Sequence, residues 1–433
     1  MFKKTLIASA ILGVVATGAL AAQVEVYGRI DTGFSYTKNK LGVDASITGG
    51  TNVPPALSDL SWSGDDHAFS MDSGNSTGSR WGLRGSEDLG NGLKVGFVLE
   101  SGFDSDTGAL GSSGTIFNRE STLWLEGGFG RVYAGRMSTF LNDAGSTGFY
   151  GGLVSPFGTG WGKLAGHAAV MAGYDTTRNN NAITYVSPTF AGLTVYAQYA
   201  MGSNDNENES TSDRYAALGA SYINGPIQVA AVMDYLNKRS AGVIGGVDGG
   251  DITELHPYIG EPDDAWTFNL GGAYDFEVAK VYGAVQYFKN ATDVGGIVSD
   301  IYGVVETFDQ GDELVDLFHS YVSVDGWGVN IGTDVPLAGG LLKLSAGYMD
   351  GEFNNVGGLV GDFISQVNPK MDVKAYNIMA GYEYPFSKRT NVYFGAGYTK
   401  RELEIGVSQG TDSANIDIEH EIFQAMFGLV HKF

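Results

Sequence analysis

The last segment of the chain, residues 421–433, alternates between two kinds of side chain. One parity is apolar: Phe423, Ala425, Phe427, Leu429 and Phe433. A period of two predicts a strand whose two faces lie in different environments. No later segment of the chain can cover the apolar face, so we expect lipid to cover it.

The same alternation recurs in earlier segments, at 93–100, 193–200, 280–288 and 342–348. A soluble β-sandwich shows this alternation as well, with its apolar face turned inward. Tyrosines near predicted strand ends, at Tyr382, Tyr384 and Tyr398, are typical of the aromatic girdle of a membrane barrel. We therefore favour the barrel over the sandwich.

Turn and loop signals divide the chain into pairs of strands. Short connections are predicted at 88–92, 127–130, 189–192, 224–225, 276–278, 337–340 and 384–390. Long connections are predicted at 36–77, 104–117, 139–180, 203–212, 238–264, 291–324, 351–372 and 403–418. This order predicts an all-β fold, a 16-stranded antiparallel transmembrane β-barrel with short periplasmic turns and long extracellular loops. A barrel of this size encloses a lumen wide enough for water.

The N-terminal segment predicts export. Lys3 and Lys4 precede an apolar stretch, and Ala19-Leu20-Ala21 supplies the small residues of a cleavage site. We expect a cleaved signal peptide at 1–21, with cleavage after Ala22 or an uncleaved membrane anchor as alternatives. Residues 22–433 then form a single barrel domain.

Composition excludes several classes of function. The chain has no cysteine, which removes disulfides and thiolate chemistry, and its formal net charge of −23 argues against nucleic-acid binding. The six histidines have no metal-ligand spacing, and no serine–histidine arrangement indicates a hydrolase. We expect no metal, no cofactor and no enzymatic activity.

Short motifs along the chain carry a family resemblance. They lie at 26–31 (Val-Tyr-Gly-Arg-Ile-Asp), 79–90, 129–136, 185–192, 387–391 and 428–433 (Gly-Leu-Val-His-Lys-Phe). In this order the chain resembles the general trimeric porins of Gram-negative outer membranes, of the betaproteobacterial and neisserial type. The resemblance implies passive diffusion of small hydrophilic solutes and ions through a water-filled channel in the outer membrane. It further implies a homotrimer among lipid and lipopolysaccharide, inserted by the barrel-assembly machinery with Phe433 as part of the signal.

The resemblance also implies a pore constriction, formed by loop 3 folded inward at about 139–180 and by arginines on the wall. The wall arginines would be Arg29, Arg80, Arg119 and Arg178. Strand parity places Arg29, Arg80 and Arg178 opposite the apolar faces of their strands. For Arg119 the same parity would send Glu120 and Trp124 outward, which a subunit interface could accommodate. Arginines at the rim of the barrel are the alternative.

Loop 3 departs from the family pattern. Its tip, 149–166, contains no acid and carries Lys163. The turn Ser155-Pro-Phe-Gly158 stands where family members often have an acidic Pro-Glu-Phe-Gly turn. Asp143 is the best remaining acid for the constriction. A cationic constriction would favour anions.

Other readings stay open. Aromatic residues of loop 3 are compatible with a solute-specific porin: Phe149, Tyr150, Phe157 and Trp161. The long loops at 36–77 and 238–324 are compatible with a barrel that serves as a scaffold for adhesion or host binding. The loops at 203–212, 291–324 and 403–418 contain 13 acidic and no basic residues, which indicates either simple solvation or recruitment of cations.

Overall fold

The computed structural model describes residues 24–48, 61–161, 164, 177–201, 213–238, 263–291, 323–354, 370–409 and 412–433. The predicted signal peptide at 1–21, the loop at 203–212 and Lys163 lie outside these residues. Within them, no helix is long and apolar enough to cross a membrane.

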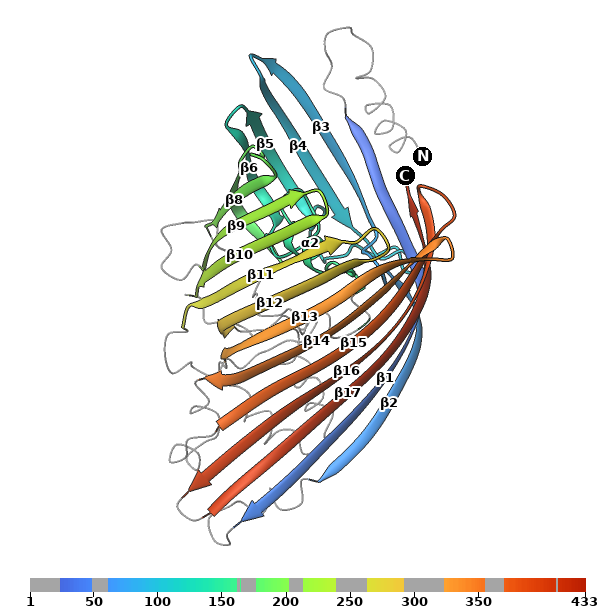
Figure 1. The fold of residues 1–433 in the computed structure, drawn as a ribbon, viewed down its shortest axis with the longest axis vertical. Coiled ribbons are helices and arrows are strands. Elements are labelled where there is room, and N and C mark those ends of the chain that lie inside the picture. Colours follow the sequence, from blue (N-terminus) through green and yellow to red (C-terminus); the bar gives the residue numbers. More distant parts are fainter. Residues whose placement is uncertain are drawn as a thin grey trace, which may run out of the picture.

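The described residues form one antiparallel sheet that closes on itself (Figure 1). Its strands are β1 (Glu25–Thr48), β2 (Trp62–Ser73), β3 (Arg80–Gly90), β4 (Leu93–Gly102), β5 (Glu120–Gly127), β6 (Gly130–Ser138), β7 (Arg178–Val186), β8 (Leu193–Ala200), β9 (Arg214–Asn224), β10 (Ile227–Asn237), β11 (Ala265–Asp275), β12 (Lys280–Ala291), β13 (Ser323–Leu337), β14 (Gly340–Asn354), β15 (Lys370–Pro385), β16 (Thr390–Gln409) and β17 (Asp412–Lys432). The ring closes where β1 pairs with β17, from Arg29 opposite Lys432 to Thr48 opposite Ser413.

Two of these strands share one place in the ring. The start of β1, Glu25–Arg29, pairs with β3, whereas Thr32–Val43 of the same strand pairs with β2. The strands β2 and β3 are therefore two halves of one wall position, interrupted at residues 74–79. Counted by position, the barrel has 16 strands, as the sequence predicts.

The seven predicted short turns connect neighbouring strands as expected. In the turn between β3 and β4, Asn91 adopts a left-handed backbone with φ of 53°, between two glycines that adopt the same region. For two of the predicted long loops the predicted extent was wrong, because strands occupy much of each range. Much of 36–77 continues β1 and forms β2, and most of 403–418 belongs to β16 and β17.

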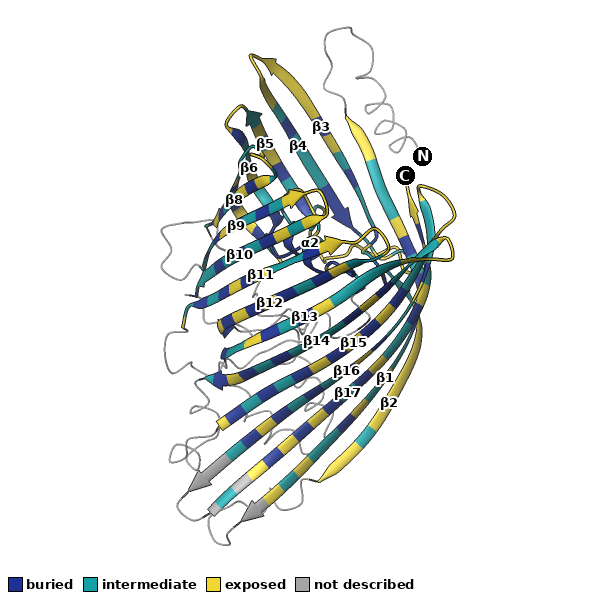
Figure 2. Ribbon diagram, viewed as in Figure 1, coloured by how far each residue is buried: buried dark blue, intermediate teal, exposed yellow. Residues whose placement is uncertain are grey.

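The faces of the central strands are those of a membrane barrel. In β8, Thr194 and Gln198 are buried while Leu193, Val195 and Tyr199 are exposed. Figure 2 shows this alternation of buried and exposed positions along most strands. Polar side chains therefore face the interior and apolar side chains face outward, the reverse of a soluble sandwich.

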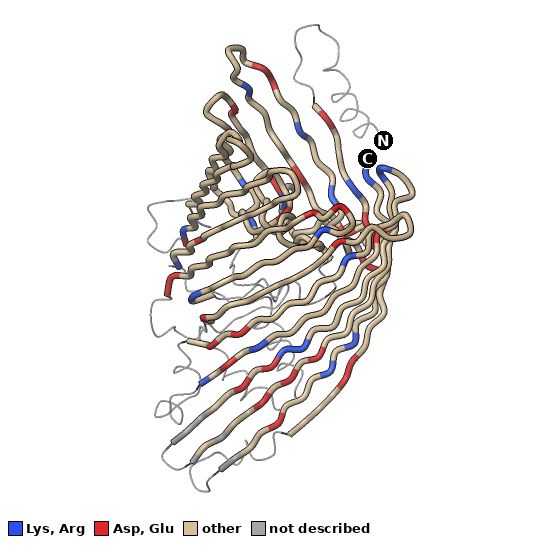
Figure 3. Tube along the Cα trace, viewed as in Figure 1, with Lys and Arg blue, Asp and Glu red and all other residues tan. Residues whose placement is uncertain are grey.

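This pattern inverts toward the far end of the longest strands. In β17, Asp417 and Glu419 point outward, whereas Ile416, Ile418 and Ile422 are buried. Figure 3 shows acidic and basic residues along β15, β16, β17 and β1 in this region. The inversion explains why the sequence predicts loops in this region. Charged residues at every second position resemble the composition of a loop, although here they lie on the solvent-exposed face of a strand that continues beyond the lipid.

Candidate functional site

The segment that follows β6 folds into the interior of the barrel. It contains the short helix α2 (Tyr150–Val154). Phe140, Tyr150 and Val154 are buried against small or apolar side chains of the wall: Ala217, Ala230, Val232 and Ala284. This first half of the segment is therefore packed against β9, β10 and β12.

The second half of the segment reaches a different part of the wall. Phe157, Trp161 and Leu164 form a buried cluster with Met379, Tyr393, Met426 and Val430, which belong to β15, β16 and β17. The rings of Trp161 and Tyr393 meet edge to face, with 5.4 Å between their centroids. A Cβ on Gly395 would lie 2.7 Å from the Trp161 ring, so glycine provides the room for this contact. Residues 139–161 therefore cross the lumen from one wall to the other; we call them the lumen segment.

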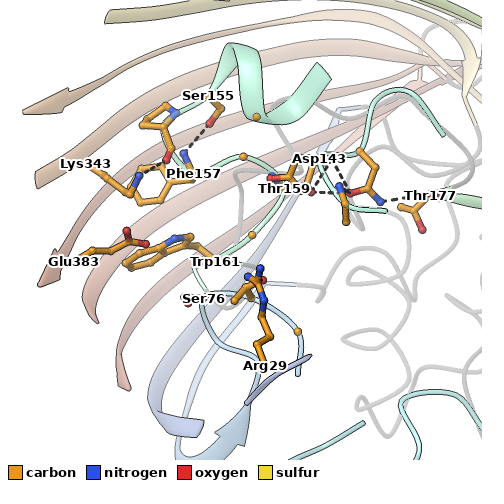
Figure 4. A pocket seen from close by; sticks show the side chains of 18 of the residues that line it. Arg29, Ser76, Asp143, Ser155, Phe157, Thr159, Trp161, Thr177, Lys343 and Glu383 are labelled. Carbon is orange, nitrogen blue, oxygen red and sulfur yellow. Dashed lines mark hydrogen bonds between the residues drawn. The ribbon is translucent and has the colours of Figure 1, made fainter. Parts of the chain in front are cut away.

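Beside the lumen segment lies a cavity of about 650 Å³. Its lining includes all four predicted arginines, Arg29, Arg80, Arg119 and Arg178, together with Asp143. Figure 4 shows Arg29 and Asp143 in the lining. The arginines come from β1, β3, the residue before β5, and β7. The four predicted arginines therefore line one and the same cavity.

One buried carboxylate holds two of these arginines. Glu100 of β4 accepts from Arg119 Nε at 2.7 Å, and Arg80 Nε lies 3.6 Å from its other oxygen. The Tyr27 hydroxyl donates to the same carboxylate at 3.1 Å. Glu100 thus neutralises part of the cluster and orients the Arg119 guanidinium group through a hydrogen bond. Sequence reasoning placed Glu100 on the polar face of its strand but did not connect it with the arginines.

A row of cations crosses three neighbouring strands. Arg29 lies directly opposite Arg80 of β3 on one side and opposite Lys432 of β17 on the other. Like charges at directly opposite positions destabilise a sheet. Such a row therefore costs folding stability, which is typical of a functional site. Lys432 is exposed and lines a different pocket from the four arginines.

The parity problem at Arg119 has a local explanation. Arg119 precedes the first residue of β5 and bonds through its backbone N–H to the Glu100 carbonyl oxygen at 3.2 Å. Glu120 is buried and Trp124 packs against the inner cluster, so both face the interior rather than a subunit interface. In β7, Asn181 adopts a left-handed backbone with φ of 52°. The alternation of inward and outward side chains is therefore shifted between Arg178 and the residues that follow Asn181.

The acids of the cavity come mainly from the wall. Asp143 on the lumen segment accepts from the Thr159 N–H at 3.0 Å. The other two acids in the lining are Asp334 of β13 and Glu383 of β15, neither of which was predicted. Asp334 accepts from the Tyr282 hydroxyl at 2.7 Å and lies 3.4 Å from Lys343 Nζ.

Family comparison decides what kind of protein this is. The family model for Gram-negative porins matches residues 8–402. The chain belongs to the Gram-negative porin family. An outer membrane porin of Bordetella pertussis is 33% identical over 96% of this chain and 99% of its own length. Outer membrane porin protein 32 of Delftia acidovorans is 30% identical over 92% and 90%.

Solved structures agree with this porin in fold. An anion-selective porin from Comamonas acidovorans superposes with a TM-score of 0.58 at 23% identity, covering 95% of this chain and 100% of its own. Salmonella typhi OmpF, in complex with daunomycin, gives a TM-score of 0.53 at 16% identity over 95% and 98%. The family and the closed barrel place the porin in the bacterial outer membrane.

The aromatic residues of the lumen segment serve the packing of this porin. Tyr150, Phe157 and Trp161 are each less than 5% exposed, and Phe149 stacks on Tyr196 at 4.1 Å between ring centroids. Burial raises the pKa of the Tyr150 phenol, so it stays neutral. Rings held in this way offer little surface along which a sugar could slide.

Among the residues that the structure describes, no group of three or more acidic or histidine side chains is placed to hold a metal ion.

Proposed function

We propose that the lumen segment narrows the channel and that the arginine-lined cavity is the constriction through which small hydrophilic solutes and ions diffuse. The observation that carries this proposal is the convergence of four arginines on one cavity beside a segment that crosses the lumen. Arginine suits the task because its guanidinium stays charged at any relevant pH. No step of catalysis is needed for this function.

Two opposing electrostatic effects set the ion preference. The chain as a whole carries −23, and exposed acids on β16 and β17, such as Glu404, Asp417 and Glu419, attract cations to the mouth of the barrel. Those charges are screened beyond ~8 Å at physiological salt, whereas the arginines act on an ion within the cavity. Rings of basic residues select anions in pores. We therefore infer a weak anion preference at high salt that moves toward cations at low salt.

Replacing two of the arginines tests the constriction. The double variant Arg80→Ala with Arg178→Ala should shift the reversal potential in a salt gradient toward cations and enlarge the single-channel conductance. Arg84→Ala is the matched control, because Arg84 of β3 pairs with Glu25 and is half exposed, away from the cavity. Wild-type selectivity in the double variant would show that these arginines do not line the constriction.

Three partner assignments belong to the same proposal. The porin assembles as a homotrimer, its wall contacts lipid and lipopolysaccharide, and the barrel-assembly machinery recognises a signal that includes Phe433. Family membership supports the first two, and the exposed ring of Phe433 at the seam supports the third. A solute-specific channel is less well supported, because the aromatic rings of the lumen segment are buried.

A further inference from the structure

The wall position shared by β2 and β3 is interrupted by residues 74–79, which we call the strand break. Its residues Asn75, Ser76 and Ser79 are almost fully buried. Ser76, Thr77 and Gly78 line the same cavity as the four arginines. The chain thus leaves the wall after β2, passes along the lumen and rejoins the wall at Arg80.

Both ends of the strand break are tied to one residue of the neighbouring strand. The backbone carbonyl oxygen of Asp31 accepts from the Gly74 N–H at 2.9 Å, and the Asp31 N–H donates to the Ser79 hydroxyl at 3.0 Å. The left-handed backbone of Gly74, with φ of 73°, turns the chain inward at this point.

The carboxylate of Asp31 holds the middle of the strand break. One oxygen accepts from the Ser76 N–H at 2.9 Å, the Ser76 hydroxyl at 3.1 Å and the Thr77 N–H at 2.8 Å. The other oxygen accepts from the Tyr393 hydroxyl of β16 at 2.6 Å. Asp31 is fully buried, and hydrogen bonds to a carboxylate in such a place are strong.

The strand break in turn holds parts of the site. The Thr77 hydroxyl oxygen accepts from Arg29 Nη1 at 3.0 Å. The Ser76 carbonyl oxygen accepts from the Trp161 N–H at 2.9 Å, at the end of the lumen segment. Asp31 is therefore connected through Thr77 to an arginine of the cavity and through Ser76 to the lumen segment.

We propose that the strand break is a second wall of the constriction, facing the lumen segment, and that Asp31 is the positioning residue that sets its place. This inference rests on the proposed function, since it assigns parts of the same constriction. Asp31 itself does not touch a permeating ion. It acts through Thr77 and Ser76, so its loss loosens Arg29 and the end of the lumen segment together.

The first test labels the strand break directly, which the absence of cysteine from the chain makes selective. In the variant Thr77→Cys, a methanethiosulfonate reagent that adds a sulfonate should lower the current of the reconstituted channel. Asp65→Cys is the control, because Asp65 lies exposed on β2. Complete labelling of Thr77→Cys with unchanged current would overturn the assignment of the strand break to the constriction.

The second test concerns Asp31. In Asp31→Asn an amide nitrogen replaces one carboxylate oxygen and cannot accept from its donors, so we expect higher open-channel noise and a larger conductance. Asp65→Asn removes an equal charge from the exposed face of the same hairpin and should leave both unchanged. If Asp31→Asn moves the reversal potential and leaves noise and conductance as in the wild type, Asp31 acts by charge alone and the positioning role is wrong.

A neutral variant covers the case in which Asp31→Asn does not fold. Tyr393→Phe removes one of the donors to the Asp31 carboxylate without changing the charge. We expect it to raise the open-channel noise, though by less than Asp31→Asn. Heat-modifiable migration on gels shows whether each variant is folded. A wild-type channel that carries no current would instead refute the proposed function, irrespective of Asp31.

Discussion

At Glu100, one carboxylate lies between two guanidinium groups, and this arrangement sets how strongly the arginines act. Its side chain is 8% exposed, and those of Arg80 and Arg119 are 15% and 14% exposed, so water screens the three charges only in part. The acid therefore weakens the field of the cluster and at the same time relieves the repulsion within it.

Glu100→Gln separates these two effects. Loss of the negative charge leaves Arg80 and Arg119 facing each other, so we expect the free energy of unfolding to fall by about 1–3 kcal/mol. The same change should move the reversal potential further toward anions. Urea unfolding of the refolded porin measures the free energy of unfolding, and bilayer recording measures the reversal potential. Glu25→Gln breaks an exposed pair with Arg84 and should cost less than about 1 kcal/mol; equal effects of the two variants would contradict the role of Glu100.

At the scale of elements, the lumen segment is held at both ends by packing against the wall. Its second anchor combines the Trp161 ring with a hydrogen bond from Lys343 Nζ to the Pro156 carbonyl oxygen at 2.8 Å. The barrel behind it is closed by hydrogen bonds between strands and does not depend on this contact. Weakening the anchor should therefore change the channel before it changes the barrel.

Trp161→Ala is expected to enlarge the conductance, because about 3 kcal/mol of local packing is lost and the end of the lumen segment is released. Single-channel recording measures the change, and unchanged strand content by circular dichroism confirms an intact barrel. Trp62→Ala is the control, since Trp62 is 47% exposed on β2. A normal conductance in Trp161→Ala would mean that the Trp161 ring is not needed, and that contacts such as those of Lys343 and the Ser76 carbonyl oxygen hold the segment.

The two ends of the chain form another element, the seam of the barrel. The Phe433 N–H donates to the Gly28 carbonyl oxygen at 3.1 Å, and the Gly28 N–H donates to the backbone oxygen of Phe433 at 3.2 Å. Phe433→Ala should lower the amount of heat-modifiable folded porin in outer membranes, since it removes an exposed ring that we assign to the insertion signal. Phe386→Ala removes another exposed ring at a turn and should have no such effect. A normal folded yield with altered conductance would count against this assignment.

At the scale of the whole molecule, the outer surface carries a row of aromatic rings across four strands. Phe34 stacks on Phe69 at 5.7 Å and on Phe427 at 5.2 Å, and Phe427 lies 6.4 Å from Phe394. We expect a native mass of three chains in mild detergent, with this row near a subunit contact. Phe34→Lys together with Phe427→Lys should reduce the trimer, whereas the same change at Phe268, on the wall at β11, should not. Monomers alone in the wild type would refute the trimer.

The sequence predicted the barrel well because the period of two reports directly which face of a strand meets lipid. Parity and family motifs singled out the arginines, and Arg29, Arg80, Arg119 and Arg178 line one cavity in the structure. Sequence reasoning did not find Glu100, Glu383 or the strand break. These features depend on contacts between residues that are distant in the sequence. Asp31 and Tyr393, for example, are 362 positions apart, and no local sequence pattern predicts their contact.

The seam between β1 and β17 has a consequence for the order of events during biogenesis. Every other neighbouring pair in the ring is nearly consecutive in sequence, so those hairpins can form while the chain is still being delivered. The pairing of Arg29 with Lys432 has to wait for the final residues. Until then the sheet has two free edges, and unpaired edges recruit other chains. The interval between arrival of β17 and its pairing with β1 is thus the time at which this protein is most exposed to aggregation, and it ends in the same step that closes the barrel wall.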